Sequence, residues 1–145
     1  MSDRTEALLM AADRAQHVHE RIAPALVSGQ HVVSDRHVAS SLAYQGVGRG
    51  LGLEVVSDLN AFAVNGLSPD LVILLGVDAH DARDRLGSDL DRIEHAGSEL
   101  AELVQETYRG LAAADPGRWA VVDGRGTIGD VARRVDVVVA ERLGL

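Results

Sequence analysis

The stretch "LVILLGV" at residues 71–77 most constrains how this chain of 145 residues can fold. A continuous run without a polar side chain is typical of a strand buried on both faces in a parallel sheet. Two further segments, residues 31–34 and "WAVVDG" at 119–124, also predict strands. Segments whose apolar residues recur at helical spacing separate these strands, and this alternation favours crossover connections between parallel strands. We therefore predict an α/β fold in three layers, with helices flanking a parallel sheet of about three strands.

The spacing of apolar residues predicts helices between and around these strands. The expected helices cover residues 5–27, 38–45, 53–65, 79–86, 93–114 and 128–143, and a glycine loop, "GVGRGLG", covers 46–52. Asp3 followed by Glu6 resembles a capping box at the start of the first helix. Thr127 with Asp130 is expected to cap the last one. Gly29 is the residue expected to follow the end of the first helix.

The length of the chain predicts a single domain over residues 1–145, with no visible repeat or internal boundary. Three strands are nevertheless few, because doubly wound sheets usually carry about five or six. The first predicted helix also has no strand before it on which to pack. The sequence therefore predicts a truncated version of such a fold, whose missing elements would precede residue 1.

The composition excludes several classes of protein. A net charge of −8 argues against general nucleic-acid binding, which needs a basic face. The absence of cysteine excludes disulfides and zinc–thiolate sites. No apolar run approaches the roughly 18 residues of a membrane span, and a charged N-terminus does not resemble a signal peptide. We therefore expect a cytoplasmic protein that contacts neither membrane nor nucleic acid.

All 14 basic residues are arginines, and the chain contains no lysine. A Walker-A loop, GxxxxGK[ST], needs its lysine to reach the β- and γ-phosphates of a nucleotide. This chain is therefore not expected to hold ATP by itself. The loop "GVGRGLG" does not replace that motif, because it follows a helix and has the wrong spacing for a dinucleotide fingerprint.

An Asp35–Arg36 pair follows the strand predicted at 31–34, where side chains of a parallel sheet project toward a ligand. The alternative is a surface pair that caps the next helix. Arg14 lies on the apolar side of the first helix, and its forked guanidinium suits bidentate phosphate binding. The alternative for Arg14 is an ion pair between helices, with Asp13 or a neighbouring carboxylate. The residues alone leave both choices open.

Five blocks in a fixed order closely resemble bacterial thymidylate kinase over residues 3–145. They are "EALLMAADRAQHV", "VVSDRHVASSLAYQGVGRG", "PDLVILLGV", "DRIE" and "VVDG". The resemblance implies a P-loop kinase-like fold whose first third, with the P-loop, is absent from this chain. It also implies transfer of a phosphoryl group from ATP to dTMP, giving dTDP, with Mg²⁺ as cofactor.

The same resemblance implies roles for residues near the predicted strand end. Arg14 and Arg36 would hold the phosphate of dTMP, and Asp35 would help organise Mg²⁺ and phosphate. Tyr44 and Gln45 would contact the deoxyribose and the thymine. The alternative for Tyr44 is a packed aromatic at a capped helix end.

Four further residues complete the set that the resemblance implies. Ser41 lies on the helix face of Tyr44 and Gln45. Met10 stands where many family members place a phenylalanine that stacks on thymine; methionine can cover a base but stacks less well. Arg85 and Arg92 fall in the lid region, where arginines stabilise charge on the transferring phosphoryl group.

The chain is thus expected to bind dTMP or a related nucleoside monophosphate, to be inactive as a kinase alone, and to form a homodimer. Two alternatives remain open. One is a non-catalytic remnant that binds nucleotides or forms oligomers. The other is one half of a kinase whose P-loop comes from a separate chain.

Overall fold

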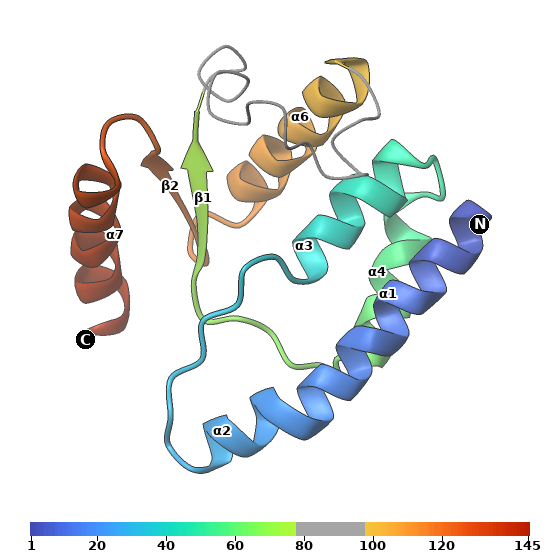
Figure 1. The fold of residues 1–145 in the computed structure, drawn as a ribbon, viewed down its shortest axis with the longest axis horizontal. Helices are drawn as coiled ribbons and strands as arrows, with labels where there is room; N and C mark the ends of the chain where they lie inside the picture. Colours follow the sequence, from blue (N-terminus) through green and yellow to red (C-terminus); the bar gives the residue numbers. More distant parts are fainter. Residues whose placement is uncertain (78–97) are drawn as a thin grey trace. The chain divides into compact units, whose positions relative to one another are not determined.

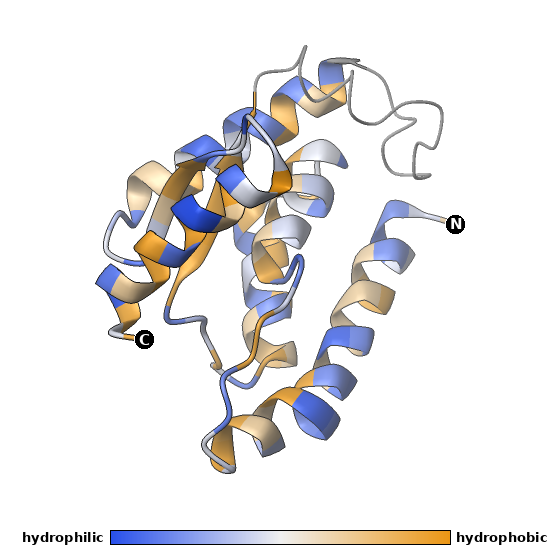
Figure 2. Cartoon of the chain, turned by 60° about the vertical axis from the view of Figure 1, so that its left-hand side comes forward, coloured by the Kyte–Doolittle hydropathy of each residue, from blue (hydrophilic) through white to orange (hydrophobic). Residues whose placement is uncertain are grey.

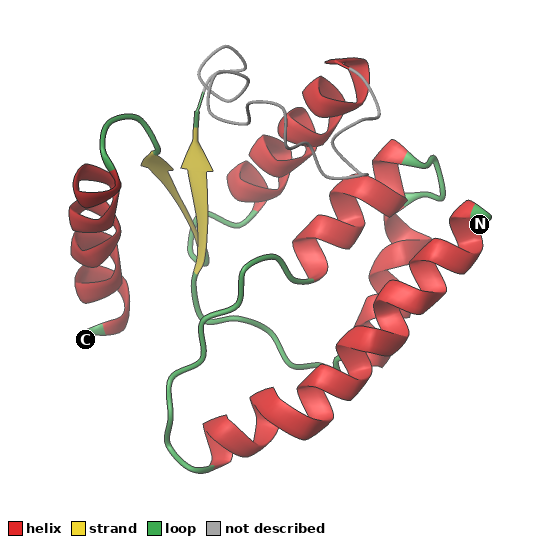
Figure 3. Ribbon diagram, in the orientation of Figure 1, coloured by secondary structure: helices red, strands yellow, loops and turns green. Residues whose placement is uncertain are grey.

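A computed structural model describes residues 1–77 and 98–145. The chain divides into two compact units, Met1–Ser68 and Pro69–Leu145. The first unit is helical in its described residues, and the second holds a parallel sheet with helices (Figures 1 and 3). The predicted α/β class with a parallel sheet and flanking helices is confirmed. The prediction of one domain over residues 1–145 stays a prediction.

The first unit begins with one long helical stretch. It comprises α1 (Asp3–His17), a π-helical turn η1 (Val18–Ile22) and α2 (Ala23–Val27). Pro24 lacks an N–H group and cannot continue an ordinary helical ladder, which accounts for the irregular turn directly before it. The helix ends in a Schellman motif, as expected at Gly29, whose φ is 78°.

The start of α1 differs from the predicted capping box. Ser2 is the N-cap, and its hydroxyl accepts a hydrogen bond of 3.2 Å from the backbone N–H of Thr5. Asp3 lies inside the first turn, and the carboxylate of Glu6 accepts a hydrogen bond from the side chain of Gln45. A serine one residue earlier already offers the hydroxyl that the N-cap position prefers, so the cap moves by one residue.

Three more elements complete the first unit: α3 (Val38–Ser41), the π-helical segment η2 (Leu42–Gly48) and α4 (Leu53–Ala63). The helix predicted to stop at residue 45 thus runs three residues into the expected glycine loop. Gly50 and Gly52 make the turn, with φ of 67° and 93°. α1 packs against α4, and the buried residues of the two helices include Ala7 and Ala11 on α1 and Val56 on α4.

The strand predicted at residues 31–34 is wrong. These residues form part of the loop between α2 and α3, drawn in green in Figure 3. Val33 is 98% exposed, so the apolar pair at 32–33 is not in a core. A strand forms only where a neighbour accepts its backbone hydrogen bonds. Among the described residues, the one ladder is that of β1 with β2.

The second unit contains that two-stranded parallel sheet. β1 (Val72–Gly76) pairs with β2 (Trp119–Asp123), and the register sets Leu74 opposite Val121. Both strands are apolar along most of their length (Figure 2). α6 (Ser98–Ala114) and α7 (Ile128–Leu143) contact β2. Leu75 is 49% exposed, so β1 is not buried on both faces as predicted.

The last helix follows the prediction closely. Thr127 and Asp130 form a reciprocal capping box at the start of α7, and Gly144 ends the helix with φ of 68°. The helix predicted at 79–86 and the first residues of the helix predicted at 93–114 lie outside the described residues. Within residues 1–77 and 98–145, no helix is both long and apolar enough to cross a membrane.

Candidate functional site

Arg14 extends from α1 across the first unit to two different elements. Its Nη1 donates to the side-chain oxygen of Asn60 on α4, and its Nη2 donates to the carbonyl of His37 at 3.2 Å. Burial lowers the pKa of Arg14, while the neighbouring Asp13 raises it. An arginine keeps its charge under such conditions. Arg14 thus joins α1 to α4 through a neutral amide, and not through the ion pair between helices that was the alternative from the sequence.

Asp35 and Arg36 lie in the loop directly before α3. Arg36 has φ of 59°, an uncommon value for a residue other than glycine. The hydroxyl of Ser34 donates to the Arg36 carbonyl at 3.1 Å. The guanidinium of Arg36 lies over the ring of Tyr44, 5.5 Å from its centroid, within the range of a cation–π contact. The carboxylate of Asp35 is exposed.

The contact between Arg14 and His37 brings the two predicted phosphate residues into one region. The carbonyl that Arg14 holds belongs to the residue next to Arg36. A guanidinium has five N–H donors, and the two described contacts use two of them. Arg14 can therefore keep its structural partners and still offer donors to an anion at the 35–37 loop.

The residues expected around the sugar and base lie on the helices beside that loop. Ser41 and Gln45 are buried, each 3% exposed, and Tyr44 is half-buried. Met10 is 39% exposed and precedes Arg14 by four residues, so both lie on one face of α1. The first unit thus contains every predicted dTMP residue, from Met10 to Gln45.

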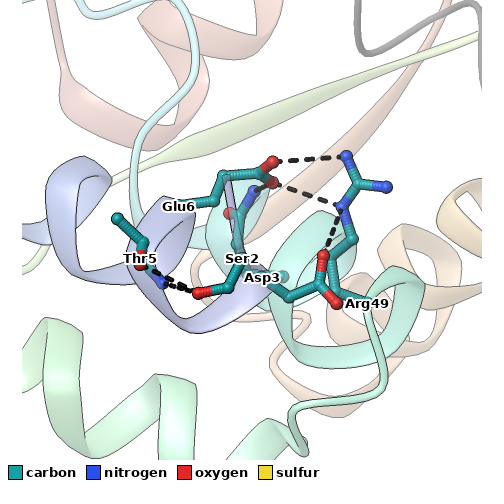
Figure 4. Close-up of polar contacts among 6 residues, drawn as sticks. Ser2, Asp3, Thr5, Glu6 and Arg49 are labelled. Atoms are coloured by element: carbon teal, nitrogen blue, oxygen red, sulfur yellow. Dashed lines mark hydrogen bonds and ion pairs between the residues drawn. The ribbon is translucent and has the colours of Figure 1, made fainter.

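Glu6 and Arg49 form a polar network that was not expected from the sequence. Glu6 accepts a hydrogen bond of 2.9 Å from Nε2 of Gln45. Its two oxygens also accept from Nε and Nη2 of Arg49, each at 3.3 Å, as Figure 4 shows. Asp3 lies 3.7 Å from Arg49. The sequence could have indicated Glu6, because Glu6, Met10 and Arg14 follow one another at a spacing of four residues and so share one helix face.

Asn60 and His37 were not expected as site residues either. Asn60 is 1% exposed and donates to the carbonyl of Val56 at 2.8 Å. The sequence could have indicated Asn60, because this polar residue stands between Val56 and Val64 on an apolar helix face. His37 Nε2 is buried and has no hydrogen-bond partner within the described part of the chain. Burial lowers the pKa of His37, and the charges of Arg14 and His17 lower it further.

The second unit offers fewer of the predicted groups. Arg85 and Arg92 lie outside the described residues. At the carboxyl end of β2, Asp123 pairs with Arg125 at 2.9 Å, and these hydrogen bonds lower the pKa of Asp123. Nη1 of Arg134 donates to the carbonyls of both residues, at 2.7 and 2.6 Å. These contacts stabilise the turn into α7.

Comparisons with known proteins converge on one family. The family model described as thymidylate kinase matches residues 1–135. The chain is 43% identical over 142 residues to a thymidylate kinase of Staphylococcus haemolyticus, covering 96% of this chain and 70% of that one. It is 43% identical to one from Bifidobacterium longum, covering 97% and 68%. It is 41% identical to one from Enterococcus faecalis, covering 98% and 69%.

Proposed function

The chain belongs to the thymidylate kinase family, and we propose that its first unit binds the phosphoryl acceptor, dTMP or a closely related nucleoside monophosphate. The observation that carries this proposal is the hydrogen bond from Arg14 to the His37 carbonyl. It holds the α1 arginine beside the loop that presents Arg36. Two guanidinium groups from separate elements can clamp one phosphate dianion, for which their forked geometry is suited.

The proposed base and sugar contacts come from the neighbouring helices. Gln45 pairs with the pyrimidine edge through its amide, and Ser41 contacts the nucleotide from the same helix face. Tyr44 restricts the space beside the sugar. The stacking of its ring on Arg36 also supports the proposal, because it holds the phosphate-binding arginine near the sugar contact. Met10 covers one face of the base as a polarizable apolar side chain.

Asp35 is the residue proposed to contact Mg²⁺. Its carboxylate is exposed and makes no hydrogen bond or ion pair with the rest of the described chain. Residues 1–77 and 98–145 contain no group of three metal-binding side chains. Proteins often hold Mg²⁺ through one or two carboxylates together with substrate phosphates, and Asp35 would supply one such carboxylate. When bound, the ion would neutralise charge on the phosphates.

The chain of 145 residues is proposed to be inactive as a kinase by itself. Without lysine it cannot make the Walker-A contact to the β- and γ-phosphates. Arg85 and Arg92 would then contribute to phosphoryl transfer only where a P-loop is supplied. An assay of ADP release with dTMP and Mg-ATP should show no turnover. A rate of about 1 s⁻¹ or more would contradict the proposal. Turnover that appears only after addition of a P-loop-bearing chain would favour the complemented kinase.

We also propose that the first unit forms a homodimer. Val55 and Phe62 on α4 are 63% and 88% exposed and lie seven residues apart, so they share a helix face. Leu8 on the adjacent helix α1 is 58% exposed. Exposed apolar side chains on two adjacent helices favour association. Sedimentation at tens of micromolar, an order-of-magnitude choice for a weak interface, should show a dimer. A monomer at every concentration would contradict it.

Calorimetry with dTMP, dUMP and AMP tests acceptor binding. Arg36→Ala should weaken dTMP binding about tenfold to a hundredfold, since hydrogen bonds to charged groups contribute about 1.5–3 kcal/mol. Arg4→Ala is the matched control, because it removes one exposed positive charge from the same unit. If the wild-type chain binds none of the three nucleotides, the acceptor proposal is wrong. If Arg36→Ala binds dTMP like wild type, the phosphate assignment is wrong.

A further inference from the structure

The amide of Gln45 has a fixed orientation. Its Nε2 lies 2.9 Å from Oε1 of Glu6. A carboxylate only accepts hydrogen bonds, so the NH₂ group of the amide, and not its oxygen, must face Glu6. Arg49 holds both oxygens of Glu6 at 3.3 Å, and this leaves the carboxylate little freedom to turn away (Figure 4).

The other end of the amide borders open space. The oxygen Oε1 of Gln45 accepts no hydrogen bond from the residues that the structure describes. It is not sealed in the interior either, because His37 Nε2 is the one buried and unpartnered side-chain atom in this part of the chain. Gln45 itself is 3% exposed, so its side chain is held by its surroundings. The residue therefore presents a carbonyl oxygen, an acceptor, to an incoming ligand.

From this geometry we propose that Glu6 is a positioning residue that selects pyrimidines carrying an N3–H group. The inference rests on the proposed function, in which Gln45 reads the base. Thymine and uracil have a hydrogen on N3 that can be donated to Oε1 of Gln45. Cytosine has a lone pair on N3, so it would set an acceptor against an acceptor. Glu6 prevents the rotation of the amide that would turn its NH₂ group toward cytosine.

The test compares dTMP, dUMP and dCMP by calorimetry on the full chain and on Glu6→Gln. A glutamine at position 6 can donate as well as accept, so the Gln45 amide becomes free to rotate. The preference for dTMP over dCMP should fall about tenfold, the cost of one unmet polar contact. The ratio of dTMP to dUMP should not change, because both bases carry N3–H. Asp3→Asn is the matched control: it weakens the contact to Arg49 without touching Gln45, and should leave both ratios as in wild type.

Gln45→Ala separates failure of this inference from failure of the proposed function. If Gln45→Ala lowers the preference for dTMP over dCMP and Glu6→Gln does not, Gln45 reads the base but Glu6 does not position it. If Gln45→Ala leaves the preference intact, Gln45 does not read the base and this inference is wrong, although dTMP binding itself can stand. If wild type binds no nucleotide, the proposed function and this inference are both wrong. Glu6→Met, which can neither accept nor donate strongly, gives a second variant should Glu6→Gln fail to fold. It should lower the same ratio, and an unchanged ratio overturns the inference.

Discussion

Replacing Asn60 by alanine should strongly destabilise the first unit. Asn60 is 1% exposed and joins α1 to α4, because its side-chain oxygen accepts from Arg14 and its amide donates to the Val56 carbonyl. Alanine removes both hydrogen bonds and leaves a half-buried guanidinium without one of its acceptors. It also leaves a small cavity where the two helices pack closely.

The size of the effect follows from the two hydrogen bonds that alanine cannot make. A hydrogen bond to a charged group contributes about 1.5–3 kcal/mol, and an ordinary one about 0.5–1.5 kcal/mol. Arg14 is half-buried, so water can partly replace Asn60, and the Val56 carbonyl is also in a helical ladder. We therefore expect a destabilisation near the lower end, about 2–3 kcal/mol. That is a large share of a typical stability of about 5–15 kcal/mol.

Urea unfolding followed by far-ultraviolet circular dichroism measures this destabilisation. A double-mutant cycle with Arg14→Ala isolates the pairwise part, for which we expect a coupling of about 1–2 kcal/mol. Ser57→Ala is the control, since an exposed residue of the same helix should change stability by no more than about 0.5 kcal/mol. A coupling energy below about 0.5 kcal/mol would show that the hydrogen bond between Arg14 and Asn60 does not join the helices.

Three further predictions concern stability. The pKa of His37 is lowered in the folded state, so His37 takes up a proton more readily in the unfolded chain. The free energy of unfolding should therefore be highest above about pH 6.5 and decrease below it. His37→Gln should flatten this pH dependence in urea titrations at about pH 5 to 7. Thr127→Ala should lower the free energy of unfolding by about 1 kcal/mol because it removes the N-cap of α7. An unchanged unfolding transition, followed by Trp119 fluorescence, would contradict this. In Gly124→Ala the new Cβ would lie 3.2 Å from the Gly76 carbonyl oxygen, so we expect a destabilisation of about 1–3 kcal/mol. Unfolding followed by Trp119 fluorescence measures it, and an unaffected midpoint would refute the close packing.

Local chemistry made some elements predictable from the sequence. The Thr127–Asp130 pair begins α7, and Gly29 ends α2, because caps depend on a few neighbouring residues. The segment 71–77 predicted β1 to within one residue at each end, because a short continuous apolar run in a small domain usually forms a buried strand. These features need no knowledge of the rest of the fold.

Elements that depend on distant partners were less predictable. Residues 31–34 have strand-like composition but form a loop in the described chain, because a strand also needs a neighbour. The continuation of the helix through Gly48 was not expected because glycine is a poor helix former, although η2 packs on α4.

The predicted site residues were found by family resemblance, whereas their supports were not. Arg14 and Gln45 were named from the sequence, yet their partners Asn60 and Glu6 lie 46 and 39 residues away in the chain. Periodicity can show that Asn60 interrupts an apolar helix face. Only the folded chain shows which guanidinium it binds.

The central claim, that Arg14 and Arg36 bind the phosphate of dTMP, is tested most directly by ¹H–¹⁵N spectra of the arginine side chains. Arg14→Lys and Arg36→Lys assign the two Nε–H signals. We predict that dTMP shifts both signals and that thymidine, which lacks the phosphate, leaves them nearly in place. Binding of dTMP that moves neither signal, or equal shifts with thymidine, would contradict the account.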